Sequence, residues 1–184
     1  VQVQHSWIMH SPLPPRKTIG DRELTVMMAS LMALNALAID SMLPAFPFMV
    51  GGLGLTDANR IQFVISVFLA GTGVGALVHG PLSDRFGRRP VLLIATVGAA
   101  IFSIACSISP TFEMLLAMRF AHGLMAAAMG VLVVSVIRDQ YEGDAMARRM
   151  STIFLIFMVV PIIAPTVGQL VLLFSGWRTI FDLM

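Results

Sequence analysis

The chain has 184 residues, of which 57% are hydrophobic and 12% carry charge, and its formal net charge is +2 at pH 7. Soluble domains carry about 25% charged residues, so this composition excludes an ordinary water-soluble globule. The basic residues stand in short groups between uncharged runs, which excludes the clustered basic face of a nucleic-acid-binding domain. Cys106 is the single cysteine, so neither an intrachain disulfide nor a cysteine-based metal site is expected.

Uncharged runs long enough to cross a bilayer recur along the chain. About 20 helical residues, each rising 1.5 Å, cross the roughly 30 Å hydrocarbon core. A polar tail is predicted over residues 1–21 and one transmembrane bundle over 22–184. The predicted spans are 22–48, 60–83, 90–110, 112–138, 147–174 and a partial sixth at 177–184. The predicted fold class is therefore an all-α membrane protein with five full spans and the start of a sixth.

The distribution of basic residues between the spans predicts the orientation. Lys and Arg collect on the cytoplasmic side of membrane proteins. The side that holds the N-terminus receives Arg16, Lys17, Arg22, Arg85, Arg88, Arg89, Arg138, Arg148 and Arg149, and the other side receives Arg60 and Arg178. The N-terminus is therefore predicted to be cytoplasmic. Because the chain starts without Met and stops just after a new span begins, we expect a fragment.

The second predicted span is rich in glycine. Gly71 and Gly75 lie one turn apart, so they share a helix face that another backbone can approach closely. A nucleotide-binding glycine loop is the alternative, but that loop follows a strand and opens a helix. Glycines inside a membrane span do not have this setting.

Asp40 is an acidic residue inside the first predicted span. A carboxylate in hydrocarbon costs several kcal/mol, so it must face a cavity, have a partner or be protonated. It lies about 24 Å along a helix from Leu24, which places it in the outer half of the bilayer. We therefore predict a proton carrier. The alternative is a polar helix-end residue near Pro44 and Pro47.

Arg119 is the only charged residue inside the fourth span, apart from those at its ends. It lies about 9 Å from the outer end of the helix that begins near Glu113. Asp40 has a similar depth, so the two residues are predicted to share an outer-half cavity. The alternative is an arginine whose stem lies along the helix while its head reaches the interface.

The segment between the second and third spans combines charges with glycines. It is predicted to form a tight charged loop over 84–90. Glycine permits a turn that larger residues resist, and an aspartate there can accept hydrogen bonds from guanidinium groups or from a helix N-terminus. The candidate residues of this segment are Gly80, Asp84, Arg85, Gly87, Arg88 and Arg89.

The pattern G-x-x-x-D-R-x-G-R-R in this segment resembles the signature loop of the major facilitator superfamily. Asp40-Ser-Met-Leu-Pro44-Ala-Phe-Pro47 resembles the first-helix motif of its drug:proton antiporters, particularly the bicyclomycin/chloramphenicol resistance subfamily (Bcr/CflA). Arg119-Phe-Ala-His-Gly123 resembles the fourth-helix R-x-x-x-G motif of the superfamily. Further resemblance is carried by segments 62–71, 138–139 and 176–181.

The resemblance implies a fold and roles for the matched residues. The chain would be most of the N-terminal six-helix half of a twelve-helix facilitator. Asp84, Arg85 and Arg89 would form a charge relay with Asp139 that latches the two halves in the outward-open state. Arg119 would couple proton binding to substrate movement, and Asp40 would be a protonation or drug-contact site.

Two departures from the antiporter pattern concern the fifth and first spans. Pro161, Pro165 and Gly168 are present in the fifth span, but the full glycine pattern of the antiporter motif is not. Some multidrug relatives carry a second acid two turns before the first-helix aspartate, and Met32 occupies that position here. These departures weaken the prediction of antiport without refuting it.

The predicted function is multidrug efflux by proton-coupled antiport in a bacterial inner membrane, without enzymatic catalysis, a cofactor or a metal. The expected partners are a small apolar drug, protons, the lipid bilayer and the C-terminal half of the same transporter, and no nucleic acid. One alternative is a sugar or metabolite porter, which we expect to show more polar residues within the spans. Another is a truncated, non-transporting membrane protein. Whether His79 or His122 titrates stays open.

Overall fold

The computed structural model describes residues 20–184, and every regular element in this range is a helix. The elements are α1 (Asp21–Asp40), η1 (Leu43–Ala45), α2 (Phe46–Gly52), η2 (Ala58–Gln62), α3 (Phe63–Phe86), α4 (Arg88–Ser107), α5 (Phe112–Gln140), α6 (Gly143–Phe174) and α7 (Arg178–Leu183). Five helical segments are long and apolar enough to cross a membrane. The predicted all-α membrane fold is confirmed, and nearly all of the predicted tail lies outside the described residues.

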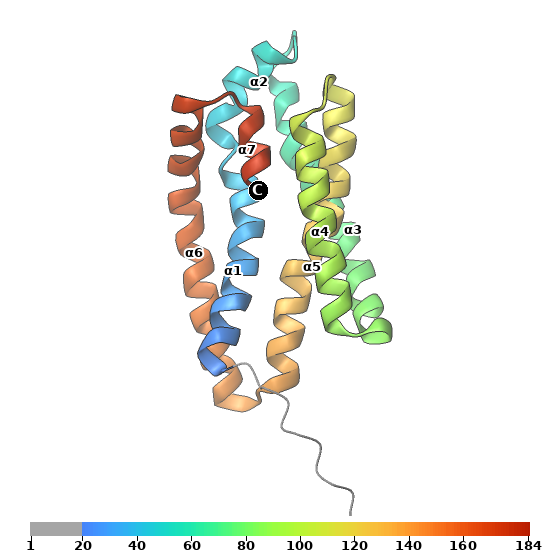
Figure 1. Ribbon diagram of the computed structural model, residues 1–184, viewed down its shortest axis with the longest axis vertical. Helices are drawn as coiled ribbons and strands as arrows, with labels where there is room; N and C mark the ends of the chain where they lie inside the picture. Colours follow the sequence, from blue (N-terminus) through green and yellow to red (C-terminus); the bar gives the residue numbers. More distant parts are fainter. Residues whose placement is uncertain (1–19) are drawn as a thin grey trace, which may run out of the picture.

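The long helices run side by side in alternating directions (Figure 1). Helix α1 packs against α6, while α3 and α4 pack against α5. The start of α1, the α3–α4 junction and the α5–α6 junction therefore lie at one end of the bundle. We call this the arginine-rich end, because it carries Arg22, Arg85, Arg88, Arg89, Arg138, Arg148 and Arg149. Helix α2 and the start of α7 lie at the opposite end.

The first predicted span is interrupted rather than continuous. Helix α1 ends at Asp40, and the chain continues through the short helices η1 and α2. Proline lacks a backbone N–H and is best tolerated in the first turn of a helix, and Pro44 and Pro47 each occupy such a position at the starts of η1 and α2. The prolines therefore place Asp40 at a helix end within the bundle.

The predicted loop over 84–90 is wrong in its extent. Helix α3 continues to Phe86 and α4 begins at Arg88, so Gly87 alone separates them. Gly87 has φ +91°, a conformation that residues with a Cβ rarely adopt. Pro90 lies in the first turn of α4, where its missing N–H costs no intrahelical bond. Asp84 and the arginines consequently occupy helix ends.

Glycines set the close approach of α3 and α5. A Cβ built on Gly71 would collide with the carbonyl oxygen of Phe120, and one on Gly75 with that of Leu124. In the reverse direction, a Cβ on Gly123 would collide with the carbonyl oxygen of Phe68. The prediction that Gly71 and Gly75 form a close-packing face is confirmed.

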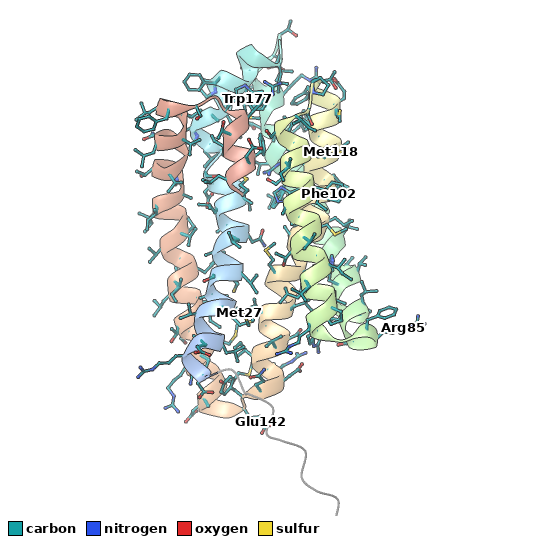
Figure 2. All side chains as sticks on the ribbon, viewed as in Figure 1. Met27, Arg85, Phe102, Met118, Glu142 and Trp177 are labelled. Atoms are coloured by element: carbon teal, nitrogen blue, oxygen red, sulfur yellow. The ribbon has the colours of Figure 1, made fainter. Side chains whose placement is uncertain are left out.

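Long apolar side chains project from the outer faces of α4 and α6 (Figure 2). Ile94 of α4 is 70% exposed, and Ile162 and Leu173 of α6 are each 75% exposed. Such surfaces suit contact with lipid or with other apolar helices. They fit a multi-pass membrane protein.

Candidate functional site

Arg119 lies in the interior of the bundle, on α5, and its side chain is fully buried. One terminal nitrogen, Nη2, donates to the Ala38 carbonyl oxygen at 3.1 Å and contacts the Met42 sulfur at 2.9 Å. The guanidinium also lies 4.4 Å from the centre of the Phe68 ring. Arg119 is thus enclosed by neighbouring helices and does not extend to the surface.

Asp40, the last residue of α1, lies in the chain between Ala38 and Met42, both of which Arg119 contacts. Its side chain is half-buried, and within residues 20–184 neither Asp40 nor Arg119 forms an ion pair. The Nε atom of Arg119 has no hydrogen-bond partner there either. Carbonyl, sulfur and ring-face contacts compensate the buried cation in part. The structure brings Arg119 to the helix break that carries Asp40, without a direct bond to the carboxylate.

Arg88 joins α3 to α5 at the arginine-rich end. Its guanidinium contacts the Asp84 carboxylate at 2.8 Å and the Asp139 carboxylate at 3.1 Å. It also donates to the Ser83 hydroxyl at 2.6 Å. We call Ser83, Asp84, Arg88 and Asp139 the Arg88 cluster.

Arg88 is one of the predicted residues of this segment, whereas the family resemblance assigned the relay to Arg85 and Arg89. Arg88 bridges the two aspartates, whereas Arg85 and Arg89 form no ion pair within residues 20–184. Figure 2 shows Arg85 pointing away from the bundle, and its guanidinium lies 5.3 Å from the Phe86 ring centre. Only Gly87 separates the two helices, so Asp84 near the end of α3 and Arg88 at the start of α4 lie close enough to pair.

A small, partly open pocket of about 60 Å³ lies near Arg119, between α1, α4, α5 and Met184, which follows α7 (Arg178–Leu183). Its polar lining residues are Asn35, Thr96 and His122, and the other lining residues are apolar. His122 also contacts Arg119, with 3.3 Å between Nδ1 and Nη1. Asn35 and Thr96 were not among the predicted site residues, because a search for charges inside spans passes over neutral polar side chains.

Comparison with known proteins decides the family. The family model described as Major Facilitator Superfamily matches residues 28–184. The chain belongs to the Major Facilitator Superfamily. The motifs at Gly80–Arg89 and Arg119–Gly123, which resemble those of this superfamily, lie within the matched residues.

Individual relatives of this facilitator include drug-resistance proteins. The chain is 36% identical over 163 residues to YdgK of Bacillus subtilis, named an uncharacterized MFS-type transporter, covering 88% of this chain and 40% of that protein. It is 37% identical over 149 residues to a chloramphenicol resistance protein of Pseudomonas aeruginosa, covering 80% and 35%. It is 31% identical over 151 residues to a bicyclomycin resistance protein homolog of Haemophilus influenzae, covering 82% and 38%. The chain thus spans well under half the length of these relatives.

A second polar cluster of this facilitator ties α1 to the α5–α6 junction. Asp21 accepts a hydrogen bond from the Tyr141 hydroxyl at 2.8 Å and pairs with Arg149 at 2.8 Å. Arg149 also donates to the Thr25 hydroxyl at 3.0 Å. Sequence reasoning missed this cluster. Its residues on α1 are more than a hundred positions from those at the α5–α6 junction, and each of them alone resembles an ordinary solvated polar residue.

The hydrogen bond to Asp21 raises the pKa of Tyr141 above its usual value. The folded protein therefore holds this phenol proton to higher pH than the unfolded chain does. The stabilising contribution is complete below the ordinary tyrosine pKa of about 10 and is lost as pH rises through the raised value. We expect Asp21→Ala to lower the titration midpoint of Tyr141, measured as tyrosinate absorbance against a Tyr141→Phe reference. An unchanged midpoint would contradict the assignment.

Proposed function

We propose that the full-length facilitator containing this chain exports small, largely apolar drugs in exchange for protons by alternating access. Relatives named for chloramphenicol and bicyclomycin resistance support the drug class. Bacterial relatives and the basic residues at the arginine-rich end support a bacterial inner membrane location with a cytoplasmic N-terminus. The C-terminal half of the transporter is the proposed partner that completes the substrate pathway.

The contacts of Arg119 with the Ala38 carbonyl oxygen and the Met42 sulfur, on either side of Asp40 in the chain, carry this proposal. Asp40 is half-buried at a helix end, and its carboxyl is the proposed site of proton exchange. When Asp40 is ionised, its charge offsets that of the buried Arg119. When it is protonated, the site gains one positive charge, and charge is felt strongly in a low-dielectric interior. Protonation therefore changes the electrostatics of the site beside the α1 break.

The proposed cycle uses this charge change to couple two movements. In the ionised state Asp40 favours binding of the drug, and in the protonated state the drug is released. The drug and the proton each favour a different conformation of the transporter. Their binding therefore shifts the population between the inward-open and the outward-open state. No covalent step is required.

Proton-coupled uptake into vesicles tests the proposal. The full-length protein is reconstituted inside-out, with the vesicle interior more acidic than the medium. Chloramphenicol should accumulate inside, and an ionophore that collapses the pH gradient should abolish the accumulation. Uptake that ignores the pH gradient would refute proton antiport, and absence of uptake would refute export of this drug.

The Arg88 cluster is proposed to hold the arginine-rich end closed. Asp139→Asn removes the charge that pairs with Arg88 across α4 and α5, so we expect transport to slow several-fold while the drug Kd stays within about twofold. Turnover in proteoliposomes and equilibrium drug binding measure the two quantities. Glu142→Gln is the matched control, because Glu142 lies exposed nearby and forms no ion pair within residues 20–184. Equal slowing in both variants would contradict a specific role for the cluster.

A further inference from the structure

A groove opens on the outer surface of α3 and α4, next to the arginine-rich end of the bundle. Its volume is about 480 Å³, within the range of about 300–1,000 Å³ that small-molecule sites occupy. All of its lining residues fall between His79 and Met125, so α6, α7 and the last residues of the sequence form no part of it. Phe86 is 59% exposed and Ile94 is 70% exposed, so the groove faces outward. We call it the His79 groove.

His79 is the one polar residue among those that line the groove. It is only 5% exposed. Its Nδ1 atom lies 2.8 Å from the Gly75 carbonyl oxygen, one turn earlier on α3. A carbonyl oxygen can only accept a hydrogen bond, so Nδ1 carries a proton, and in the neutral ring Nε2 holds a lone pair. One edge of the imidazole is thus fixed against its own helix, and Nε2 lies on the opposite edge.

The Nε2 atom of His79 is unpaired but not enclosed by protein. The bond to Gly75 is the one side-chain hydrogen bond that His79 forms within residues 20–184. The side-chain atoms of that range that are both buried and unpartnered are Asn35 Oδ1 and Arg119 Nε. Nε2 therefore belongs to the small exposed part of His79, and that part faces the groove that the residue lines. The groove contains a hydrogen-bond acceptor that the fold leaves unused.

The lining of the groove selects among possible occupants. Its walls are apolar, so they favour an apolar molecule, whereas a lone acceptor in such surroundings requires a donor. A phospholipid chain has no donor to give to Nε2. A cationic donor would be held without a counterion, because no lining residue is acidic, and a charge within the membrane needs a partner. The chemistry therefore fits an apolar molecule with a neutral O–H or N–H group.

We propose that the His79 groove is a capture site for small apolar compounds that carry a neutral hydroxyl or amide N–H. The donor of the compound binds His79 Nε2, and its apolar body lies against side chains such as Leu82 and Ile94. Such compounds dissolve in the bilayer, so the groove takes them from the leaflet at the arginine-rich end. The site is separate from the region of Asp40 and Arg119. The inference rests on the proposed function for the identity of its ligand.

Ile94→Trp tests the groove by filling it. Ile94 is largely exposed, so the larger side chain can enter the groove without disturbing the packing of the bundle. Equilibrium binding of labelled chloramphenicol, which has hydroxyl and amide groups, is measured on the full-length protein in lipid nanodiscs. The number of bound molecules per protein should fall by one relative to the unmodified protein. An unchanged number would refute the capture site, as would absence of binding to the unmodified protein.

Ile101→Trp is the matched control on the same helix. Ile101 is 58% exposed and lies seven residues after Ile94, on the same side of α4 but outside the groove lining. The number of bound chloramphenicol molecules should stay as in the unmodified protein. An equal loss in both variants would mean that an added tryptophan on α4 disturbs binding in general, and the capture site would be refuted.

A pair of competitors tests the role of His79 Nε2. 1-Naphthol has a hydroxyl donor, and 1-methoxynaphthalene has the same rings without a donor. At the site that Ile94→Trp removes, 1-naphthol should displace chloramphenicol about three- to tenfold better, the effect of one hydrogen bond. In His79→Phe, which keeps a ring but has no nitrogen, this preference should disappear. A preference that persists in His79→Phe, or that is absent from the unmodified protein, would refute the assignment of Nε2.

These measurements are independent of the proton-coupling experiment. Binding is measured at equilibrium without a pH gradient, so loss of gradient-driven uptake in vesicles leaves the expected results for Ile94→Trp and His79→Phe unchanged. Conversely, unaltered binding in both variants would refute the capture site while leaving proton-coupled export in place.

Discussion

Asp40→Asn should abolish the dependence of drug accumulation on the pH gradient while leaving drug exchange at equilibrium in place. Asparagine has nearly the same shape as aspartate but cannot gain or lose a proton near neutral pH. Gradient-driven uptake into inside-out vesicles should fall at least tenfold. Exchange of labelled for unlabelled drug, which needs no net proton movement, should persist.

Asp57→Asn is the matched control for this experiment. Asp57 is exposed and accepts a hydrogen bond from the Asn59 backbone N–H at 2.9 Å. Asparagine serves equally well at such a capping position, so accumulation should be unchanged. Gradient-driven uptake that survives in the Asp40→Asn variant would remove Asp40 from the proton pathway.

Gly123→Ala should lower the stability of the transporter more than any other single-methyl substitution proposed here. The added methyl group would meet the Phe68 carbonyl oxygen, and a backbone atom in a packed helix cannot rotate away as a side chain can. Overpacking of this kind costs about 3 kcal/mol at its upper range. The thermal unfolding midpoint of the purified full-length protein should therefore fall, and transport should fall with it, because Arg119 and His122 lie on the same helix.

Gly73→Ala gives the comparison within the same interface region. Gly73 lies on α3 between Gly71 and Gly75, but a Cβ there meets no atom within 4 Å. The unfolding midpoint of this variant should stay at or slightly above that of the unmodified protein, since alanine favours helix over glycine. If Gly73→Ala lowered the unfolding midpoint as much as Gly123→Ala, the contact of Gly123 with the Phe68 carbonyl oxygen would not be the cause of the loss.

Much of the fold was predictable because it depends on local features. Long uncharged runs predicted the membrane helices, and the spacing of Gly71 and Gly75 predicted a face for close packing, which the structure shows against α5. The position of Asp40 at a helix end could also be read from Pro44 and Pro47, although the predicted first span ran through them. Each of these features lies within one continuous segment of the chain.

The site was less predictable, because its contacts join distant parts of the chain. Arg88 reaches Asp139 across 51 positions, and Arg119 reaches Ala38 across 81. Three arginines follow one another closely at the α3–α4 junction, and sequence alone does not tell which of them faces α5. The family resemblance favoured Arg85 and Arg89 for the relay, whereas the break at Gly87 turns Arg88 toward the aspartates.

The sequence by itself determined that this chain is a helical membrane bundle of the facilitator family, since hydrophobic length and local motifs carry that information. Only the tertiary structure decided what Arg119 contacts, which arginine bridges Asp84 and Asp139, and that Asn35 and His122 line one pocket. The physical reason is that hydrophobic length is a property of each helix alone. Hydrogen bonds and ion pairs instead depend on how helices rotate and approach one another, and here glycines on α3 and α5 set that approach.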